Sequence, residues 1–254
     1  MRIAIVGGTG TLGRHITTEL SERGHEVAVL SRSSPDFPVD LVSGTGLAKA
    51  LDGCSAVVDA SNASSPKRAA QVLVEGSRRL LTAEQQAGVS HHVCISIIGC
   101  ERVPMGYYRV KVEQEQVVEQ GRVPYSIVRA TQFHELAAAA LAAAGKWRVL
   151  PIPNMKLQTV AAAEVARVVA DVAEGRPARG RVQVAGPEIA SVRELARTWR
   201  SVTGRAALML PVPVPGKLGR ALRSGGLTAD HADVLGSIRF ADWLAARRPA
   251  KSST

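Results

Sequence analysis

The chain has 254 residues, of which 46% are hydrophobic, so it is long enough to bury the core of one large domain or of a domain with a smaller lobe. The net charge of +10 comes entirely from the second half, because residues 1–127 carry 13 basic and 13 acidic side chains whereas residues 128–254 carry 19 and 9. Aromatic residues make up only 4% and do not interleave with the arginines, which favours a solvated basic surface over a nucleic-acid partner.

The chain begins with a predicted strand, a glycine-rich turn and a helix. Residues 1–13 read MRIAIVGGTGTLG, in which an apolar run leads directly into Gly7, Gly10 and Gly13. Gly7 allows a sharp turn, Gly10 allows a pyrophosphate to approach the backbone, and Gly13 allows the helix to pack against the sheet. Unpaired N–H groups at the start of that helix attract phosphate. The motif predicts a dinucleotide site, with a merely tight strand-to-helix turn as the alternative.

The second strand ends in a basic residue. After a helix over 11–23, the segment EVAVLSR predicts a strand that ends at Ser31 and Arg32, with no acidic residue there. A carboxylate at this position binds the ribose hydroxyls of NAD(H), whereas a basic residue accommodates the 2′-phosphate of NADP(H). The arginine fork and the serine hydroxyl therefore favour NADP(H), the alternative being an exposed arginine at a strand end.

The next segments continue the alternation of strands and helices. VDLV around Asp40 predicts a third strand, and Asp40 and Leu41 would then meet the adenine, although an aspartate in a loop is more often a turn residue. This pattern predicts a parallel sheet with helices on both faces. The further predicted helices are 47–51, 66–87 and 107–120, and the further strands are 55–61, 91–99 and 125–131.

Beyond residue 131 the pattern becomes less regular. LPIPNM at 150–155 predicts a loop or an edge segment, and the prolines of PVPVPG at 211–216 exclude a central strand. The remaining predictions are helices over 134–144, 161–174 and 191–203 and a strand over 181–186.

The predicted fold class is α/β, a Rossmann-type doubly wound parallel sheet with a small C-terminal α+β substrate lobe. We expect a dinucleotide-binding domain over 1–150, joined by strands from the later chain. The lobe over 151–245 would cover the carboxyl edge of the sheet, where ligands of such folds bind. The remaining tail, 246–254, has the composition of a disordered segment.

Two features bear on location. The start of the chain lacks the charged region, apolar core and cleavage site of a secretion signal, and no apolar run approaches the ~20 residues of a bilayer crossing. Cys54, Cys94 and Cys100 show no metal-ligand spacing, which favours small core thiols in a reducing compartment, with a Cys94–Cys100 disulfide as the alternative. We therefore expect a cytoplasmic protein with no metal and no membrane partner.

A tyrosine and a lysine stand four residues apart in the predicted helix over 107–120. This spacing places Tyr107 and Lys111 on one helix face, where the ammonium would lower the pKa of the phenol from its usual value of about 10. Such a tyrosine can donate a proton to a carbonyl oxygen as hydride arrives, and Ser96, at the end of the preceding strand, can hold that oxygen. The alternative is that Tyr107 packs in a groove and Lys111 is solvated.

Together, these motifs resemble a known family. GGTGTLG, Ser96, the YxxxK spacing, RATQFHE at 129–135 and AGPE at 185–188 are similar to the short-chain dehydrogenase/reductase superfamily, and within it to the atypical NmrA-like branch of NAD(P)-binding proteins, over nearly the whole chain. The resemblance implies that residues 130–133 border the nicotinamide and the substrate pocket, with His134 beside them as a pocket or structural residue. The cofactor contacts that it implies are Gly7, Thr9, Gly10, Thr11, Leu12, Gly13, Ser31, Arg32, Ala60, Ser61, Asn62, Lys111, Ala130, Thr131 and Phe133.

Two departures from the family's pattern leave the catalytic assignment open. Only eleven positions separate Ser96 from Tyr107, and a proline and a glycine make the connection a loop, so Tyr108 is a second candidate for the acid. The helix over 66–87 contains no asparagine, so the proton-relay asparagine of the family's typical tetrad is missing. The branch includes reductases of quinones, enones and natural products, and also proteins that bind the cofactor only as regulators.

We expect an NADPH-dependent oxidoreductase that reduces a small carbonyl, quinone or conjugated substrate of apolar or aromatic character by hydride transfer. Tyr107 would be the acid, Lys111 would bind the nicotinamide ribose and tune that acid, and Ser96 would orient the acceptor oxygen. The alternative is a redox sensor that binds NADP(H) without turnover and contacts a partner through its basic second half. Arg32 disfavours a third reading, sugar-nucleotide epimerisation.

Overall fold

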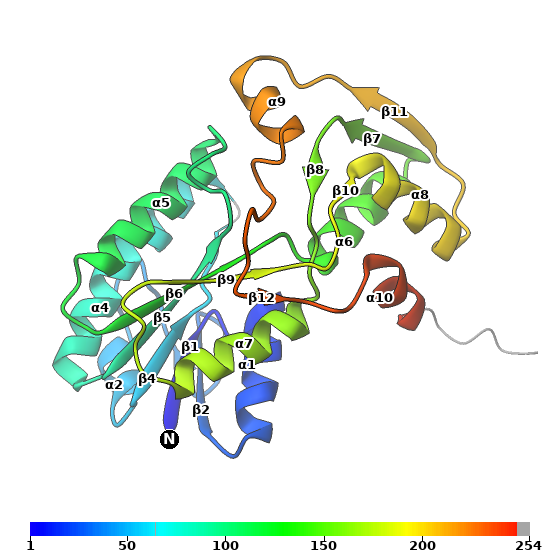
Figure 1. Ribbon diagram of the computed structural model, residues 1–254. Coiled ribbons are helices and arrows are strands. Elements are labelled where there is room, and N and C mark those ends of the chain that lie inside the picture. Colours follow the sequence, from blue (N-terminus) through cyan, green and yellow to red (C-terminus); the bar gives the residue numbers. More distant parts are fainter. Residues whose placement is uncertain (64, 248–254) are drawn as a thin grey trace, which may run out of the picture.

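An eight-stranded parallel sheet forms the centre of the molecule in the computed structural model, which describes residues 1–63 and 65–247 (Figure 1). Its strand order is β12-β9-β6-β5-β4-β1-β2-β3, so the chain leaves β1 first in one direction and then in the other. This doubly wound order confirms the predicted fold class. The strands are β1 (Arg2–Val6), β2 (Glu26–Ser31), β3 (Phe37–Pro38), β4 (Ala56–Asp59), β5 (His91–Ile97), β6 (Tyr125–Ala130), β9 (Arg181–Ala185) and β12 (Val234–Leu235).

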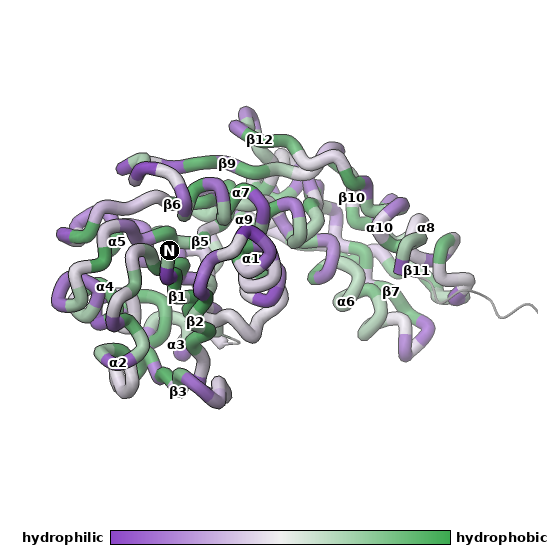
Figure 2. The backbone as a smooth tube through the Cα atoms, turned by 90° about the horizontal axis from the view of Figure 1, so that it is seen from below, coloured by the Kyte–Doolittle hydropathy of each residue, from purple (hydrophilic) through white to green (hydrophobic). Residues whose placement is uncertain are grey.

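Helices cover both faces of this sheet. One face carries α1 (Thr11–Glu22) and α7 (Ala162–Glu174), and the other carries α2 (Leu47–Leu51), α3 (Pro66–Ala69), a π-helical segment (Ala70–Glu75), α4 (Gly76–Ala87) and α5 (Gly106–Glu119). Ile3 and Ile5 of β1 pack toward α1 and α7, whereas Ala4 and Val6 pack toward the opposite layer. Burial on both faces explains why β1 is continuously hydrophobic from Ile3 to Val6 (Figure 2).

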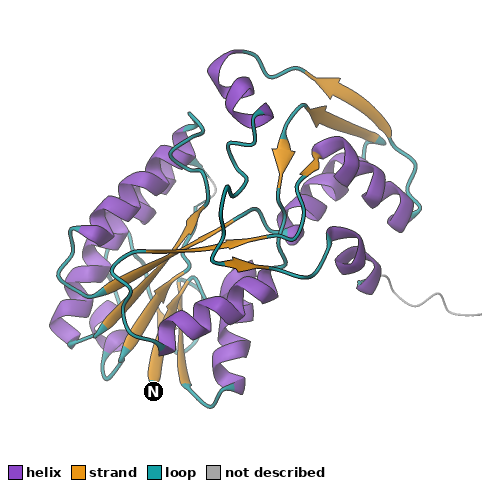
Figure 3. Cartoon of the chain, in the orientation of Figure 1, coloured by secondary structure: helices purple, strands orange, loops and turns teal. Residues whose placement is uncertain are grey.

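A smaller lobe lies beside the sheet (Figure 3). Its elements are α6 (His134–Gly145), β7 (Val149–Pro153), β8 (Lys156–Leu157), β10 (Ala190–Ser191), α8 (Val192–Thr203), β11 (Leu208–Val212), α9 (Gly216–Arg223) and α10 (Phe240–Ala246). Trp199, Phe240 and Trp243 belong to a core of its own. β7 pairs in parallel with β11, and β8 pairs antiparallel with β10. A capping box of Ser191 and Glu194 begins α8.

The chain passes between the sheet and the lobe more than once. β9 and β12 belong to the sheet and α7 covers it, although all three come from the range 151–245, whereas α6 belongs to the lobe and begins before residue 150. At the end of the chain, Ala246 closes α10 and the Arg247 guanidinium lies 4.1 Å from the centre of the Trp243 ring. The rest of the predicted tail, 248–254, lies outside the described residues.

The predicted third strand around Asp40 is wrong. The strand is β3 at Phe37–Pro38, and Asp40 forms only an isolated bridge with Thr45. The Asp40 carboxylate accepts a hydrogen bond from the Val42 N–H at 2.8 Å, which closes a turn of the kind that aspartate favours. The side chain thus stabilises a turn at the point where the apolar pattern had indicated a strand.

Other local predictions agree with the structure. Cys54, Cys94 and Cys100 are buried and free, as expected for small core thiols. The proline-rich segment 211–216 ends β11 and leads into α9, outside the main sheet. Among the described helices, none is both long enough and apolar enough to cross a membrane.

Candidate functional site

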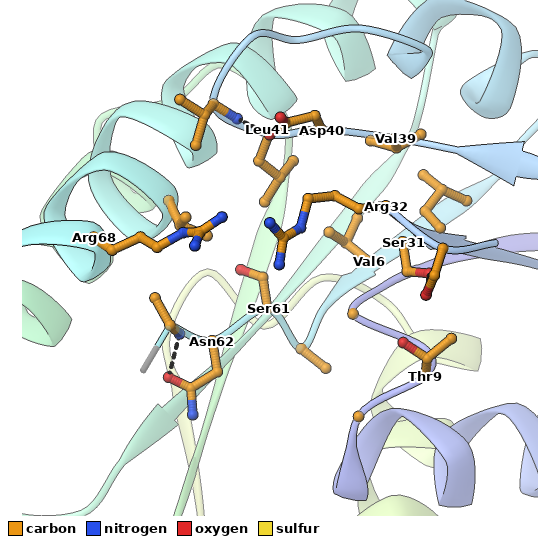
Figure 4. Close-up of a pocket in the computed structure, with 18 residues that line it drawn as sticks. Val6, Thr9, Ser31, Arg32, Val39, Asp40, Leu41, Ser61, Asn62 and Arg68 are labelled. Carbon is orange, nitrogen blue, oxygen red and sulfur yellow. Dashed lines mark hydrogen bonds between the residues drawn. The ribbon is translucent and has the colours of Figure 1, made fainter. Parts of the chain in front are cut away.

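A cavity of about 640 Å³ opens at the carboxyl ends of β1, β2 and β4, next to the point where the strand order reverses (Figure 4). Ligands of open α/β folds bind at this place. Arg68, Val39 and Ser33 line the cavity although the sequence analysis did not single them out. The predicted cofactor residues that line it are Gly7, Thr9, Gly10, Ser31, Arg32, Asp40, Leu41, Ala60, Ser61 and Asn62.

The glycine turn shapes one wall of the cavity through its lack of side chains. Gly7 has a φ of 74°, and a Cβ there would lie 2.7 Å from the Ala60 carbonyl oxygen. The Gly10 N–H donates to the Gly7 carbonyl at 2.9 Å, and a Cβ on Gly13 would collide with the backbone of Gly7. Thr11, Leu12 and Gly13 form the first turn of α1, in which Leu12 and Gly13 are buried. Only glycine therefore allows α1 to approach β1 this closely.

Two arginines enter the cavity from facing walls. Arg32 follows the end of β2, and Arg68 comes from α3, with both guanidinium groups directed into the space between them (Figure 4). Neither is in an ion pair within the described part of the chain, where Ser61 Oγ, also in the lining, is buried without a hydrogen-bond partner. A basic residue in the first turn of the helix after β4 is the signal that could have identified Arg68 from the sequence.

Tyr107 reaches the wall of this cavity. Its hydroxyl donates to Asn62 Oδ1 at 2.8 Å. Burial raises the pKa of Tyr107 to about 12, the neighbouring Tyr108 acts in the same direction, and the hydrogen bond to Asn62 opposes them. Tyr108 instead packs beside Val103 and Leu222, toward the lobe. Of the two tyrosines, Tyr107 is the one whose hydroxyl contacts a residue of the cavity.

Lys111 is a buried residue of α5, and it is not part of the lining of the cavity. Its Nζ donates to the Ile95 carbonyl and to Gln114 Oε1, both at 2.6 Å. Gln114 Nε2 in turn donates to Asp59 Oδ2 and to Ser77 Oγ, both at 3.1 Å. The expectation that the ammonium lowers the pKa of Tyr107 is not met, because Lys111 is bonded to these groups and the pKa of Tyr107 is raised.

Ser96 is buried on β5 next to a cluster of charges, also outside the lining of the cavity. Arg129 donates to both oxygens of Glu115, at 2.8 and 2.7 Å, and Arg181 adds a third contact at 3.1 Å. Burial opposes ionisation of Glu115, but the hydrogen bonds from Arg129 lower its pKa below the usual value. This cluster joins α5 to β6 and β9.

The segment after β6 also lies outside the lining of the cavity. Ala130 and Phe133 pack with the core beneath α1 and α7. The Thr131 hydroxyl accepts a hydrogen bond from the Gly186 N–H at 3.1 Å, which joins β6 to the end of β9. These residues lie at the carboxyl end of β6, a central strand. They therefore remain candidates for contact with the nicotinamide of a bound cofactor.

His134 is buried at the start of α6. Its Nδ1 lies 2.8 Å from the Thr159 hydroxyl, and its Nε2 donates to the Ile238 carbonyl at 2.9 Å. Burial lowers its pKa below the usual value. Both ring nitrogens are engaged, so His134 joins the lobe to the segment before α10 and is a structural residue.

Comparison with known proteins agrees with the glycine turn and the strand order. A family model described as "NAD(P)H-binding" matches residues 7–175, which is more than half of the chain. The chain belongs to this NAD(P)H-binding family. The matched range starts at Gly7 and ends just after α7, so it includes every residue that lines the cavity except Val6, and also the helix that packs on α1.

This NAD(P)H-binding protein has several curated relatives. The photosystem II assembly factor Ycf39 of Synechocystis is 29% identical over 236 residues, which cover 84% of this chain and 71% of the relative. Divinyl chlorophyllide a 8-vinyl-reductase of Zea mays is 26% identical over 160 residues, covering 52% of this chain and 40% of that enzyme. An assembly factor and a reductase are therefore both similar to it.

Solved structures share its fold. The NADPH complex of the NADPH-dependent quinone oxidoreductase QOR2 of Escherichia coli superposes with a TM-score of 0.80 at 18% identity, over 96% of this chain and 99% of that one. The NAD complex of UDP-glucose 4-epimerase of Thermus thermophilus superposes with a TM-score of 0.73 at 20% identity, over 84% and 86%. These similarities confirm a Rossmann-like α/β fold with a parallel central sheet.

The cavity of the NAD(P)H-binding protein fits a phosphorylated dinucleotide in three respects. The glycine turn leaves backbone exposed where side chains would fill the space. Arg32 and Arg68 offer two cations from facing walls, and the buried Ser61 hydroxyl has a free hydrogen-bonding capacity toward the cavity that it lines. Leu41 contributes apolar surface beside Arg32, where an adenine ring would lie.

Proposed function

We propose that this protein is a reductase that binds NADP(H) and transfers hydride to a small apolar carbonyl, quinone or conjugated acceptor in the cytoplasm. The observation that carries the proposal is the pair Arg32 and Arg68 in the cavity of the glycine turn. Guanidinium groups bind phosphate through two parallel hydrogen bonds, and NAD(H) has no 2′-phosphate. Arg32 after β2 and Arg68 of α3, facing it across the cavity, therefore favour NADP(H).

Each wall of the cavity would hold one part of the cofactor. Gly7, Gly10 and the first turn of α1 would receive the pyrophosphate. Leu41 would contact the adenine, while Arg32 and Arg68 would hold the 2′-phosphate. The bound nicotinamide supplies the hydride, and the protein supplies position and a proton.

Tyr107 would donate that proton. The hydrogen bond to Asn62 keeps its hydroxyl at the wall of the cavity. Burial raises its pKa to about 12, so the phenol is protonated at neutral pH and carries a proton that it can donate.

Lys111 and Ser96 would act through other residues. Lys111 connects the Ile95 carbonyl on β5 to Gln114 on α5, so it fixes the helix that carries Tyr107. Ser96 is buried on β5 directly opposite Arg129 of β6, which binds Glu115. We assign both residues a positioning role, and neither a contact with the acceptor.

The test begins with calorimetric titration of the purified protein with NADPH and with NADH. The protein is then mixed with NADPH and a panel of quinones, enones and aldehydes while the absorbance of the reduced nicotinamide is followed. We expect tighter binding of NADPH than of NADH and oxidation of NADPH with at least one acceptor. Heat with neither cofactor would contradict the proposal.

Two variants separate the chemical step from binding. Tyr107→Phe should lower kcat about 10²-fold with the Kd for NADPH unchanged, because only the proton donor is removed. Tyr108→Phe is the matched control and should leave kcat unchanged. If NADPH binds but no acceptor is reduced, the protein is instead an NADP(H)-binding regulator, a function favoured by its similarity to an assembly factor.

A further inference from the structure

The β7–β11 ribbon is apolar on both of its faces. In the parallel pairing, Leu208, Leu210 and Val212 of β11 lie opposite Val149, Pro151 and Pro153 of β7. Since residues alternate between the two faces of a strand, these six side chains share one face. The other face carries Leu150, Ile152 and Met209, which pack into the core of the lobe. We call the first set the ribbon face.

The ribbon face is exposed. The exposed fraction is 62% for Leu208, 43% for Leu210 and 40% for Val212, and Trp147, in the turn that leads into β7, is 84% exposed. Four of the eleven large hydrophobic residues that are exposed in the described part of the chain are therefore in or next to this one ribbon. A sheet with one face in water normally carries polar residues there, so an apolar outer face indicates a contact surface.

The chain around the ribbon face is strongly basic. The two segments that contain β7 and β11, residues 136–163 and 195–229, include nine lysines and arginines and no aspartate or glutamate. Parallel strands begin at the same end, so the basic residues before β7 and before β11 gather at one end of the ribbon, while α9 brings others to its far end. The basic residues are Lys146, Arg148, Lys156, Arg197, Arg200, Arg205, Lys217, Arg220 and Arg223.

This charge decides between possible occupants. A second copy would bring the same nine cations to the contact, and nothing acidic in these segments would compensate for their repulsion. An exposed tryptophan and aliphatic side chains on a narrow ribbon, with cations at both ends, are the combination that binds the surface of anionic lipids. We propose that the ribbon face docks on an anionic lipid surface.

Docking there leaves the cofactor cavity accessible. The ribbon lies at the end of the lobe that is remote from β1 and β2 in both views (Figures 1 and 2). The sequence predicts no membrane partner, because no segment is long enough to span a bilayer. Peripheral docking needs no such segment, only an apolar face with cations around it. The inference does not depend on the identity of the cofactor or on turnover.

The experiment compares vesicles of phosphatidylcholine alone with vesicles that also contain about 30% of the anionic lipid phosphatidylglycerol. Trp199 and Trp243 are buried, so Trp147 is the exposed tryptophan that reports on the contact. We expect co-flotation with the anionic vesicles, a blue shift of tryptophan emission on binding, and loss of both in high salt. Binding to neutral vesicles should be at least about tenfold weaker.

Substitutions then locate the contact. Leu208→Ser together with Trp147→Ser should lower partitioning about tenfold or more, and Arg148→Glu about fivefold or more. Leu235→Ser is the matched control, because Leu235 is 64% exposed but lies on β12 of the main sheet. The far-ultraviolet circular dichroism spectrum should be the same in every variant, which shows that the fold is intact.

Three outcomes would overturn the proposal. The first is equal or no binding to the two kinds of vesicle. The second is an equal loss in Leu235→Ser and Leu208→Ser. The third is sedimentation of the protein as a dimer that Leu208→Ser dissociates, which would make a second copy the occupant. A negative result for NADPH binding would contradict only the proposed function and would leave this inference intact.

Discussion

Two strands in different parts of the molecule share a pattern and differ in environment. β1, with the sequence RIAIV, is apolar at successive positions, and helices cover it on both sides, so Ile5 is fully buried. β11, LMLPV, is equally apolar, but only the Met209 side packs on a core, and Leu208 and Leu210 are exposed. Continuous apolarity therefore indicates burial only when the tertiary structure supplies two layers.

The charges around the two strands differ as well. The half of the chain that contains β1 has equal numbers of basic and acidic side chains, and many of them pair within the fold. In the segments that contain β7 and β11, residues 136–163 and 195–229, all the charged side chains are basic. The comparison implies that β1 contributes to stability and to the cofactor site, whereas the outer face of β11 is free to bind something else.

The largest difference between the two strands should be in stability. Ile5→Ala removes a fully buried side chain from between two helical layers, so we expect the free energy of unfolding to fall by about 2–5 kcal/mol. Urea unfolding followed by far-ultraviolet circular dichroism measures this. A loss below about 0.5 kcal/mol would show that the core beneath α1 tolerates a cavity, contrary to the tight packing of β1.

The second prediction concerns the cavity at the end of β1. Arg68→Ala should weaken NADPH binding about 10- to 100-fold, the value of a charge-assisted hydrogen bond to phosphate, and should change NADH binding little. Arg32→Ala should act in the same direction. Arg78→Ala on the exposed face of α4 is the control. Equal losses for NADPH and NADH, measured by calorimetry, would place Arg68 at the pyrophosphate that both cofactors share.

The third prediction concerns a buried pair between β5 of the main sheet and α4. His92 Nδ1 lies 2.8 Å from Glu84 Oε1, and both side chains are fully buried. Burial alone would lower the pKa of His92, but the Glu84 carboxylate raises it well above its usual value, and burial raises the pKa of Glu84. Both shifts mean that the folded state binds more protons than the unfolded state.

Stability from the raised pKa of His92 should therefore be fully present below the unfolded pKa of that group, about 6.5, and should be lost as the pH rises through the higher folded value. Urea unfolding across neutral and mildly alkaline pH measures the slope. His92→Gln should flatten it, because the titrating group is removed. A wild-type protein whose stability is constant or rises over this range would show that the pair is not protonated in the folded state.

The smallest effect is expected at the ribbon face. Leu208→Ser should change the free energy of unfolding by less than about 0.5 kcal/mol, because the side chain is already 62% exposed. The contrast with Ile5→Ala tests the comparison directly under the same urea conditions. A loss of 2 kcal/mol or more, roughly a core-type value, would show that another part of the protein covers Leu208 in solution.

Local sequence patterns predicted most of the elements near the cofactor site. Helix α2 has the predicted bounds, 47–51, and α1 starts at the predicted residue, Thr11. The glycine positions were readable because each has a local steric reason. Asp40 shows the limit of this reading, since a side chain that closes a turn overrides an apolar pattern.

The catalytic residues were harder to predict because their roles depend on distant partners. Helical spacing correctly placed Tyr107 and Lys111 on one helix, but spacing carries no information about Ile95 and Gln114, which bind the ammonium. Arg68 was missed for a similar reason. Only the folded chain brings it across the cavity from Arg32, since the two are far apart in sequence.

By itself, the sequence determined the alternation of strands and helices, the glycine turn and the uneven distribution of charge, because these follow from short-range sterics and composition. The tertiary structure alone decided which tyrosine hydroxyl bonds to Asn62, which groups the Lys111 ammonium binds, and which face of each apolar strand is covered. Those outcomes depend on contacts between segments that are distant in the chain, and a local pattern holds no record of such contacts.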